Sequence, residues 1–377
     1  MSGPLAGVRV VHLASLGPGS YAAMLLADLG ADVVVVDRTA DMTTSVPADR
    51  DPRRRGQRSI RLDLKRPDSH AVLDDLLATA DVLIEGMRPG AAERLDLGPE
   101  RLLALNPRLV YARMTGWGQS GPLAQRAGHD INYIGLTGAL HAMGDPDRPP
   151  PVPLNLLGDY AGGGTFLVMG VLAALFERVR SGKGQIVDGA IIDGAGSMTA
   201  ATLGMLATDR WHDRGTNVLD GGAPWYRTYR CADGGFMAVG AIEPQFYVEL
   251  LTRLGLDPAD FPRDDPGTRD RLAHTLTELF ASADRSHWEA VFADSDACVT
   301  PVLSFAEATE HPHQHERAGY LDLAGVRQPS PAPRLSRTPA PTPAAPPDLG
   351  AHTDDLLREL GRTAPEITAL HRDGAVA

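Results

Sequence analysis

The chain of 377 residues is too long for one ordinary hydrophobic core, so we expect two domains. Its 43% hydrophobic and 22% charged residues are typical of a soluble globular protein, and a net charge of −12 argues against broad binding to nucleic acid or an anionic membrane. The two cysteines, Cys231 and Cys298, fit neither a disulfide framework nor a metal knuckle, which favours a reducing cytosol.

The chain begins with a strand, a glycine turn, a helix and a second strand. Residues 8–13 and 33–36 are β-branched runs, and the turn from Gly17 and the helix-like AAMLLADLG lie between them. This order is a βαβ unit. It predicts a parallel sheet in the N-terminal half of the chain.

The same unit resembles a dinucleotide fingerprint. Gly17, Gly19 and Ala22 fit the loose glycine pattern, and Asp37 lies near the position of a ribose-binding acid. Short glycine patterns are weak, however, and Pro18 removes an N–H that would face a pyrophosphate. A nicotinamide site is therefore kept only as a minor alternative.

Residues 51–67 form a basic segment in an otherwise acidic chain. Runs of charge are usually solvated faces, but arginine side chains also match phosphate oxygens, and the contrast in charge favours a polyanionic ligand. The segment carries seven cations: Arg53, Arg54, Arg55, Arg58, Arg61, Lys65 and Arg66.

Further helices and strands alternate along the first half of the chain. We expect helices over 68–80, 166–180 and 195–208, and strands over 81–85, 108–114 and 185–192. The turn from Gly86 to Gly90 follows a strand, at the edge where open α/β sheets bind ligands. The apolar run 166–176 is too short to span a bilayer and is interpreted as a buried helix.

A smaller domain follows, with strands over 227–231, 235–241 and 299–303. Its first helix begins near Glu243, and others are expected over 268–283 and 287–294. The HPHQHE segment, 311–316, is interpreted as a polar loop rather than a metal site. Overall we expect a large α/β domain over 1–200 completed by 330–377, a linker over 201–225, a small α+β domain over 226–325 and a proline-rich return linker over 326–350.

The stretch 128–164 holds the candidate acid and base. His129–Asp130 opens a helix-like segment, and Asp159 precedes a glycine run and a long apolar helix. Helix starts favour developing negative charge, and a histidine and a carboxylate can both exchange protons near neutral pH. Taken singly, His129 reads as a structural histidine, Asp159 as a helix N-cap and Glu243 as a first-turn acid.

Seven segments in the same order resemble one family. They are GPLAGVRVVHLASLGPG, RRGQRSIRLDLK, IEGMRPG, ARMTGWGQSGP, GHDINYIGLTG, NLLGDYAGGG and GAIEPQFY. This arrangement resembles the family III CoA-transferase superfamily of the CaiB/BaiF type, and within it the α-methylacyl-CoA racemase branch. The resemblance implies a Rossmann-like large domain, a smaller α+β domain and an interlocked homodimer.

The resemblance also implies a reaction and its residues. The reaction would interconvert (R)- and (S)-2-methylacyl-CoA by 1,1-proton transfer through an enolate. His129 and Asp159 would be the two acid/base groups, Glu243 from the partner would orient the histidine, and backbone N–H groups near Asp130 would stabilise the enolate. The implied CoA and substrate site consists of Arg38, Leu62, Asp63, Leu64, Lys65, Arg88, Gly128, Asp130, Ile131, Asn132 and Tyr133.

Two rival interpretations stay open. In a CoA transferase of this fold, Asp159 would be the nucleophile that forms an anhydride and then an enzyme–CoA thioester. A non-catalytic acyl-CoA-binding protein is the other. The GHDINY histidine and GAIEPQFY favour the racemase. We expect no cofactor beyond the CoA moiety of the substrate, no metal, and no nucleic-acid or membrane partner. The C-terminal GAVA is no recognisable address, which favours the cytoplasm.

Overall fold

The structure, a computed structural model, describes residues 2–40 and 46–377. It contains two compact units. Unit 1 consists of Met1–Thr137, Pro153–Met198 and Ala318–Ala377, and unit 2 of Gly138–Val152 and Thr199–Arg317. Residues 138–152, expected within the large domain, and 201–225, expected as a linker, both belong to unit 2. The proline-rich segment belongs to unit 1.

Unit 1 is built on a six-stranded sheet in the order β3-β2-β1-β4-β5-β6, with every pair of neighbours parallel. The strands are β1 (Arg9–Leu13), β2 (Asp32–Arg38), β3 (Gln57–Leu62), β4 (Val82–Glu85), β5 (Val110–Thr115) and β6 (Ile186–Ala190). The predicted α/β fold is confirmed. Strand order reverses between β1 and β4, so the carboxyl ends of these strands open a crevice.

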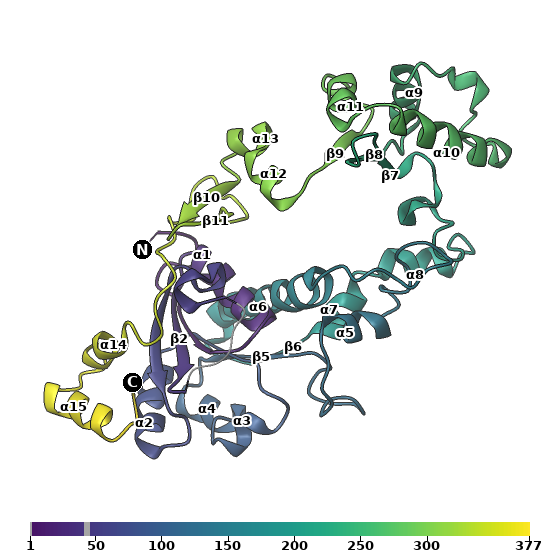
Figure 1. Ribbon diagram of the computed structural model, residues 1–377. Coiled ribbons are helices and arrows are strands. Elements are labelled where there is room, and N and C mark those ends of the chain that lie inside the picture. Colours follow the sequence, from purple (N-terminus) through teal and green to yellow (C-terminus); the bar gives the residue numbers. More distant parts are fainter. Residues whose placement is uncertain (1, 41–45) are drawn as a thin grey trace. The chain divides into compact units, whose positions relative to one another are not determined.

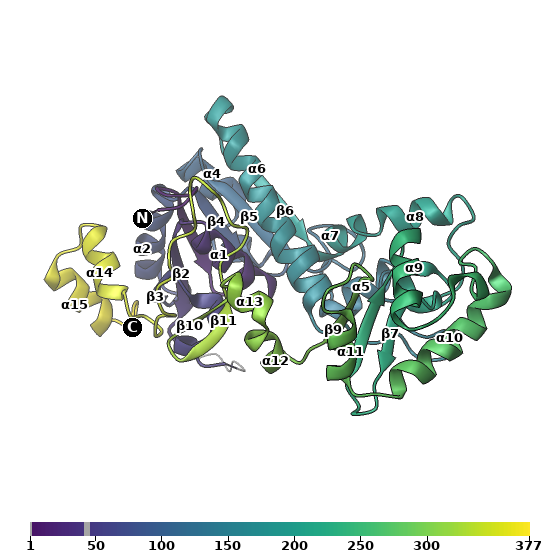
Figure 2. The same cartoon turned by 90° about the horizontal axis from the view of Figure 1, so that it is seen from above.

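Helices cover both faces of this sheet, which explains why its strands are continuous apolar runs (Figure 2). One core joins the sheet to α2, α4 and the tail, and the other joins it to α1 and α6. The helices of the first half are α1 (Pro18–Asp28), α2 (Pro67–Ala78), α3 (Ala91–Arg94), α4 (Pro99–Leu105), α5 (Asp130–Leu136), η3 (Leu156–Thr165), α6 (Phe166–Ser181) and α7 (Ile191–Ser197), with short turns η1 (Ala48–Arg50) and η2 (Pro52–Arg54).

The C-terminal tail completes unit 1 (Figure 1). A hairpin of β10 (Tyr320–Leu323) and β11 (Val326–Pro329) precedes the extended proline-rich segment, and helices α14 (Thr353–Glu359) and α15 (Ala364–Arg372) follow it. Leu356, Leu357 and Ile367 join the core against the sheet, and Val376 makes a bridge to Leu62. Burial of these side chains holds the tail on the sheet face that carries α2.

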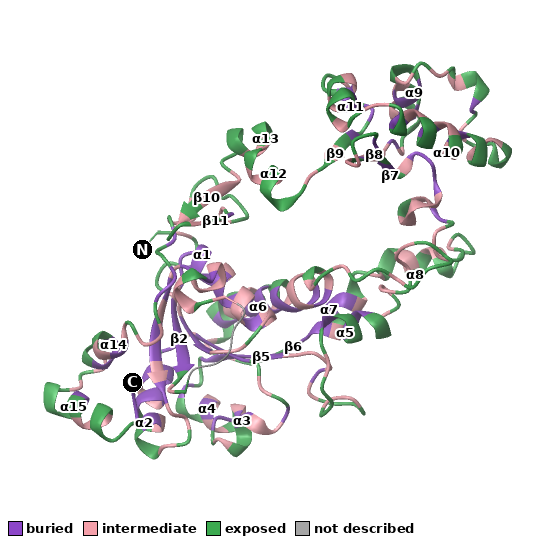
Figure 3. Ribbon diagram, in the orientation of Figure 1, coloured by how far each residue is buried: buried purple, intermediate pink, exposed green. Residues whose placement is uncertain are grey.

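Helix α6 is not the buried helix that the sequence predicted. With η3 it forms a helical segment, Leu156–Ser181, that is long and apolar enough to cross a membrane by length and composition. One side packs on the sheet, where Arg178 pairs with Asp81 at 2.7 Å. The other side carries exposed residues: Phe176 is 71% and Val179 84% accessible. Figure 3 colours the helix by this burial. The helix therefore covers the sheet of unit 1 and leaves an apolar stripe that the described residues do not cover.

Unit 2 has an antiparallel sheet in the order β7-β8-β9 and an aromatic core around Trp225, Tyr229, Phe280 and Trp288. The segment 311–316, expected as a loop, is instead helical, and the described residues contain no cluster suited to a metal ion. The elements of unit 2 are α8 (Ala200–Leu206), η4 (Val218–Gly222), β7 (Tyr226–Arg230), β8 (Phe236–Gly240), α9 (Pro244–Arg253), η5 (Pro258–Asp260), α10 (Pro266–Ala281), α11 (Arg285–Phe292), β9 (Val299–Val302), α12 (Phe305–Glu310) and α13 (Pro312–Glu316).

Candidate active site

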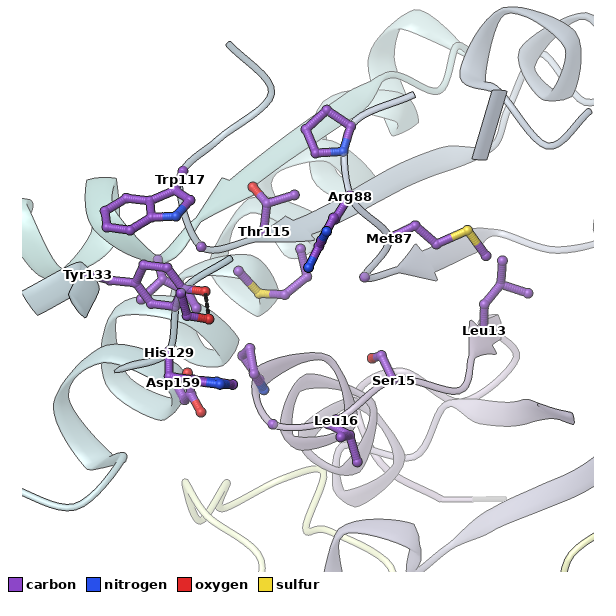
Figure 4. Close-up of a pocket in the computed structure, with 18 of the residues that line it drawn as sticks. Leu13, Ser15, Leu16, Met87, Arg88, Thr115, Trp117, His129, Tyr133 and Asp159 are labelled. Carbon is purple, nitrogen blue, oxygen red and sulfur yellow. Dashed lines mark hydrogen bonds between the residues drawn. The ribbon is translucent and has the colours of Figure 1, made fainter. Parts of the chain in front are cut away.

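A cavity of about 450 Å³ opens at the carboxyl edge of the unit 1 sheet (Figure 4). Its walls are the loop after β1, the turn after β4, the loop after β5, the start of α5 and one residue of η3. It lies at the reversal of strand order, where open α/β sheets bind ligands. Both candidate acid/base groups, His129 and Asp159, line it. Other lining residues of unit 1 are Leu13, Ser15, Leu16, Arg38, Leu64, Met87, Arg88, Thr115, Trp117, Gly128 and Tyr133.

His129 is the N-cap residue of α5. Its backbone is extended, its N–H donates to Asn132 Oδ1 at 3.0 Å, and its carbonyl accepts from the Asn132 N–H at 2.8 Å. These two bonds fix the backbone while the exposed imidazole lines the cavity. The sequence correctly placed His129 at a helix start, and Asn132 acts on the cap rather than on the cavity.

Asp159 lies inside η3, one turn after its N-cap residue Asn155. The alternative interpretation of Asp159 as a simple N-cap is therefore wrong. Asn155 Nδ2 donates to Asp159 Oδ2 at 3.3 Å. Burial raises the pKa of Asp159 above its ordinary value, and the negative charge of Asp130 adds to this rise, against the Asn155 hydrogen bond and the nearby His129. A carboxyl with a raised pKa is better suited to exchange protons near neutral pH.

Asp130 is buried behind the cavity and acts on Asp159. Its Oδ2 atom accepts a hydrogen bond from the Asp159 backbone N–H at 2.6 Å. Gly158 permits this approach, because a Cβ atom there would lie 2.5 Å from the same oxygen. The Asp130 side chain was expected to lie at the substrate. It lies instead against the backbone of η3. Ile131 is exposed and is not among the residues that line the cavity.

Tyr133 and Trp117 form one wall of the cavity. Their rings meet edge to face with centroids 4.7 Å apart, and the Tyr133 hydroxyl donates to the Gly128 carbonyl. A side chain at Gly116 would clash with the Tyr133 ring. The aromatic pair thus fixes Gly128, the residue before His129. Tyr133, which the family resemblance places at the substrate, lies in this wall.

The residues expected to bind CoA lie in two environments. Arg38, Leu64 and Arg88 line the cavity, and both arginine side chains are exposed. Leu62, in contrast, is buried in the core beneath the tail. Asp63 Oδ1 accepts the backbone N–H of the exposed Lys65 at 3.1 Å and shapes the turn that carries Leu64.

Four arginines of the basic segment pair with carboxylates of unit 1, and its interpretation as a ligand cradle stays a prediction. Arg55 forms a buried pair with Asp28, and Arg58 binds Asp32. Arg53 and Arg54 bind Asp51 and Asp37 in the same way. These four guanidinium groups therefore neutralise carboxylates of unit 1, which reduces the local excess of positive charge.

The hydrogen bonds of the Asp37 carboxylate argue against a dinucleotide site. Its two oxygens accept from Arg54 at 3.0 and 2.6 Å, and one accepts from Ser59 Oγ at 2.6 Å. A ribose-binding acid must offer its oxygens to the ligand's hydroxyl groups. Here they are already bound by protein donors.

Two residues stand apart from the predicted site, Ser15 and Glu243. Ser15, which lines the cavity two residues after β1, was not predicted; its position at the end of a predicted parallel strand was the signal. Glu243 is the exposed N-cap residue of α9 in unit 2. Its expected contact with His129 stays a prediction.

Comparison with known proteins identifies the family of this chain. The family model for CoA-transferase family III matches residues 5–353. The chain belongs to CoA-transferase family III. Within this family it is 47% identical to the α-methylacyl-CoA racemase of Mus musculus over 99% of this chain and 97% of the mouse protein, and 45% identical to the α-methylacyl-CoA racemase of Homo sapiens over 98% and 96%.

The fold agrees with the family. The crystal structure of a CAIB/BAIF family protein from Brucella suis superimposes with a TM-score of 0.84 at 28% identity, over 96% of this chain and 100% of that one. The family resemblance predicted from the seven motifs is therefore confirmed.

Proposed function

We propose that the chain is an isomerase that interconverts the (R)- and (S)-forms of 2-methylacyl-CoA thioesters. The main support for this activity is that His129 and Asp159, far apart in sequence, line one cavity of a family III fold. The extent of identity to two proteins named α-methylacyl-CoA racemase supports the same activity. The two side chains are adjacent in Figure 4.

The proposed reaction needs one acid and one base. One of the pair, in its basic form, removes the proton on the carbon next to the thioester, and the C–H electrons move onto the thioester oxygen as an enolate. The other, in its acidic form, delivers a proton to the opposite face of the planar carbon. No oxidant enters, and the pair has exchanged protonation states after each turnover. The raised pKa of Asp159 brings its proton affinity closer to that of a histidine, as this exchange requires.

The CoA portion is proposed to approach past Arg38 and Arg88. Both arginines line the cavity that holds the acid/base pair, and a guanidinium matches phosphate oxygens. Leu64 adds an apolar surface to the same cavity. The enolate donors expected at the start of α5 and the orienting role of Glu243 remain part of the proposal.

We also propose that the active form is a homodimer. The exposed stripe of α6 is the supporting observation, because Phe176 and Val179 leave a large apolar surface in water. A second copy of the chain would cover it and would offer Glu243 from outside the cavity's own unit. The proposed location is the cytoplasm, and no cofactor besides the CoA moiety of the substrate is proposed.

Deuterium exchange tests the activity directly. A single enantiomer of a 2-methylacyl-CoA is incubated in deuterated buffer with no second carboxylic acid, and the mass and chirality of the thioester are followed together. Gain of one deuterium with loss of optical purity is the expected result. No exchange, followed by CoA transfer when a free carboxylate is added, would instead assign Asp159 as a nucleophile and replace the proposal with the transferase.

A further inference from the structure

His12 and Ser15 form a hydrogen-bonded pair that the proposed reaction does not use. His12 lies in β1, in register with Val35 of β2 and Ile84 of β4, and is buried. Ser15 follows three residues later and lines the cavity. The His12 Nε2 and Ser15 Oγ atoms are 3.1 Å apart. A buried ring therefore holds a hydroxyl that the cavity exposes.

Close packing holds Ser15 in one place. A Cβ atom at Gly86 would lie 3.0 Å from Ser15 Cβ and 3.2 Å from its Oγ, and one at Gly19 would clash with that Oγ. The Ser20 hydroxyl donates to the Ser15 carbonyl. Glycines on both sides thus let the loop after β1 and the turn before Arg88 enclose a single hydroxyl position.

The tautomer of His12 decides what the hydroxyl does. Burial lowers the pKa of His12 to about 4, so the ring is neutral near pH 7 and carries one N–H. Among the described residues, Nδ1 is buried without a hydrogen-bond partner. Because orphaned buried N–H groups are rarer than orphaned acceptors, the proton belongs on Nε2. Nε2–H then donates to Ser15 Oγ, and the Ser15 proton is left to point elsewhere.

We propose that His12 positions Ser15 as a hydrogen-bond donor to an acceptor oxygen of the CoA arm, either an amide carbonyl of pantetheine or a pyrophosphate oxygen. Ser15 is the binding residue and His12 a positioning residue. This inference rests on the proposed binding of acyl-CoA in the same cavity.

The location of Ser15 favours the arm over the acyl chain. On one side the loop continues to Gly17, where a Cβ atom would lie 3.0 Å from Asp159 Oδ2. On the other side Gly86 begins the turn that carries Arg88. Ser15 therefore lies between the acid/base group and an arginine suited to phosphate, which is the stretch that the arm must cross.

A serine beside a histidine also suggests a nucleophile, but this pair lacks what that role requires. The histidine would have to take the Ser15 proton while a third group held its other nitrogen. The nearby carboxylate, Asp37, is bound by Arg54 and Ser59, and Nδ1 of His12 has no partner among the residues described. The pair is arranged for binding rather than for thioester hydrolysis.

Calorimetry with two probes tests the role of Ser15. CoA and pantetheine are titrated into the wild type, Ser15→Ala and the control Ser69→Ala, which removes a buried hydroxyl that bonds the tail. We expect Ser15→Ala to raise the Kd of CoA about 3- to 10-fold, whereas Ser69→Ala should keep the wild-type Kd. An equal rise for pantetheine assigns the acceptor to an amide carbonyl, and a rise for CoA alone assigns it to the pyrophosphate. Unchanged Kd for CoA would overturn the proposal.

Two further measurements test His12. In ¹⁵N spectra of histidine-labelled protein we expect the His12 proton on Nε2, and a proton on Nδ1 would overturn the proposal without any variant. His12→Gln retains an N–H donor and should keep the Kd of CoA, whereas His12→Leu should match Ser15→Ala. Binding of CoA needs no turnover, so a wild type that binds CoA without exchange would refute the proposed function and leave this inference standing.

Discussion

The Asp130 carboxylate and the Asp159 backbone N–H are joined by a 2.6 Å hydrogen bond across 29 positions of the chain. This contact ties the start of η3 to the start of α5, which carries His129. It also places a negative charge close to the Asp159 carboxyl, where it helps to raise the pKa. One buried aspartate therefore holds the backbone of the proposed second base and adds to the rise in its pKa that burial causes.

Asp130→Asn should separate these two effects. The amide oxygen can still accept the Asp159 N–H, but the charge that raises the pKa of Asp159 is gone. We expect the acidic limb of the pH profile of exchange to move to lower pH. Asp130→Ala also removes the acceptor and should lower kcat about 100-fold through misplacement of η3. An acidic limb at the same pH in Asp130→Asn would contradict this account.

His129→Ala should leave CoA binding largely intact and lower the exchange rate at least about 100-fold. The side chain is exposed and, among the described residues, makes no hydrogen bond or ion pair on which the fold depends, so the variant should unfold at the wild-type temperature. His274→Ala, on an exposed face of α10, is the matched control. Exchange at the wild-type rate in His129→Ala would remove His129 from the mechanism.

Asp159→Asn should be inactive yet more stable than the wild type at neutral pH. Because the folded-state pKa of Asp159 is raised, the native protein binds a proton more tightly than the unfolded chain, and its stability falls as pH rises from the unfolded pKa through the folded one. The neutral amide avoids this loss. Thermal unfolding should therefore show a higher Tm for the variant at pH 7 and no gain well below pH 4. A gain that is equal at both pH values would point to packing instead.

Arg55→Ala should destabilise unit 1 by about 3–5 kcal/mol, because it leaves Asp28 buried without its partner. Burial raises the pKa of Asp28 and Arg55 opposes this rise, so the loss should shrink at low pH as Asp28 becomes protonated. Arg58→Ala, whose pair with Asp32 is partly exposed, should cost about 1 kcal/mol or less. Denaturant unfolding of both variants at two pH values is the measurement.

Arg38→Ala and Arg88→Ala should each weaken CoA binding about 10-fold and reduce its dependence on salt, because a charge-assisted phosphate contact is lost. Arg101→Ala, which breaks a pair with Asp74 on unit 1 outside the cavity, is the control and should bind CoA normally. If neither cavity arginine affects the Kd, the phosphates lie elsewhere.

The apolar stripe of α6 gives a test of assembly. Phe176→Glu with Val179→Glu places two charges on the most exposed part of the stripe and should shift the protein from dimer to monomer in light scattering. Leu105→Glu, a single exposed leucine on α4, should not. A double variant that keeps the wild-type mass would move the proposed interface off this helix.

Local pattern was enough to predict most of the architecture. The β-branched runs at 8–13 and 33–36 became β1 and β2, because strands buried on both faces read as continuous apolar segments. His129 was placed correctly at a helix start for the same local reason. Helix α6 was misjudged, because an apolar composition does not show which side chains of a helix are buried.

The sequence by itself determined the parallel sheet through its periodicity, and it identified the family and the two acid/base candidates through the order of seven short motifs. Only the tertiary structure decided that the arginines of the basic segment neutralise carboxylates, that Asp130 holds Asp159, and that His12 holds Ser15. The first two contacts join residues 27 and 29 positions apart. The third joins near neighbours, but its tautomer follows from burial, which folding alone creates.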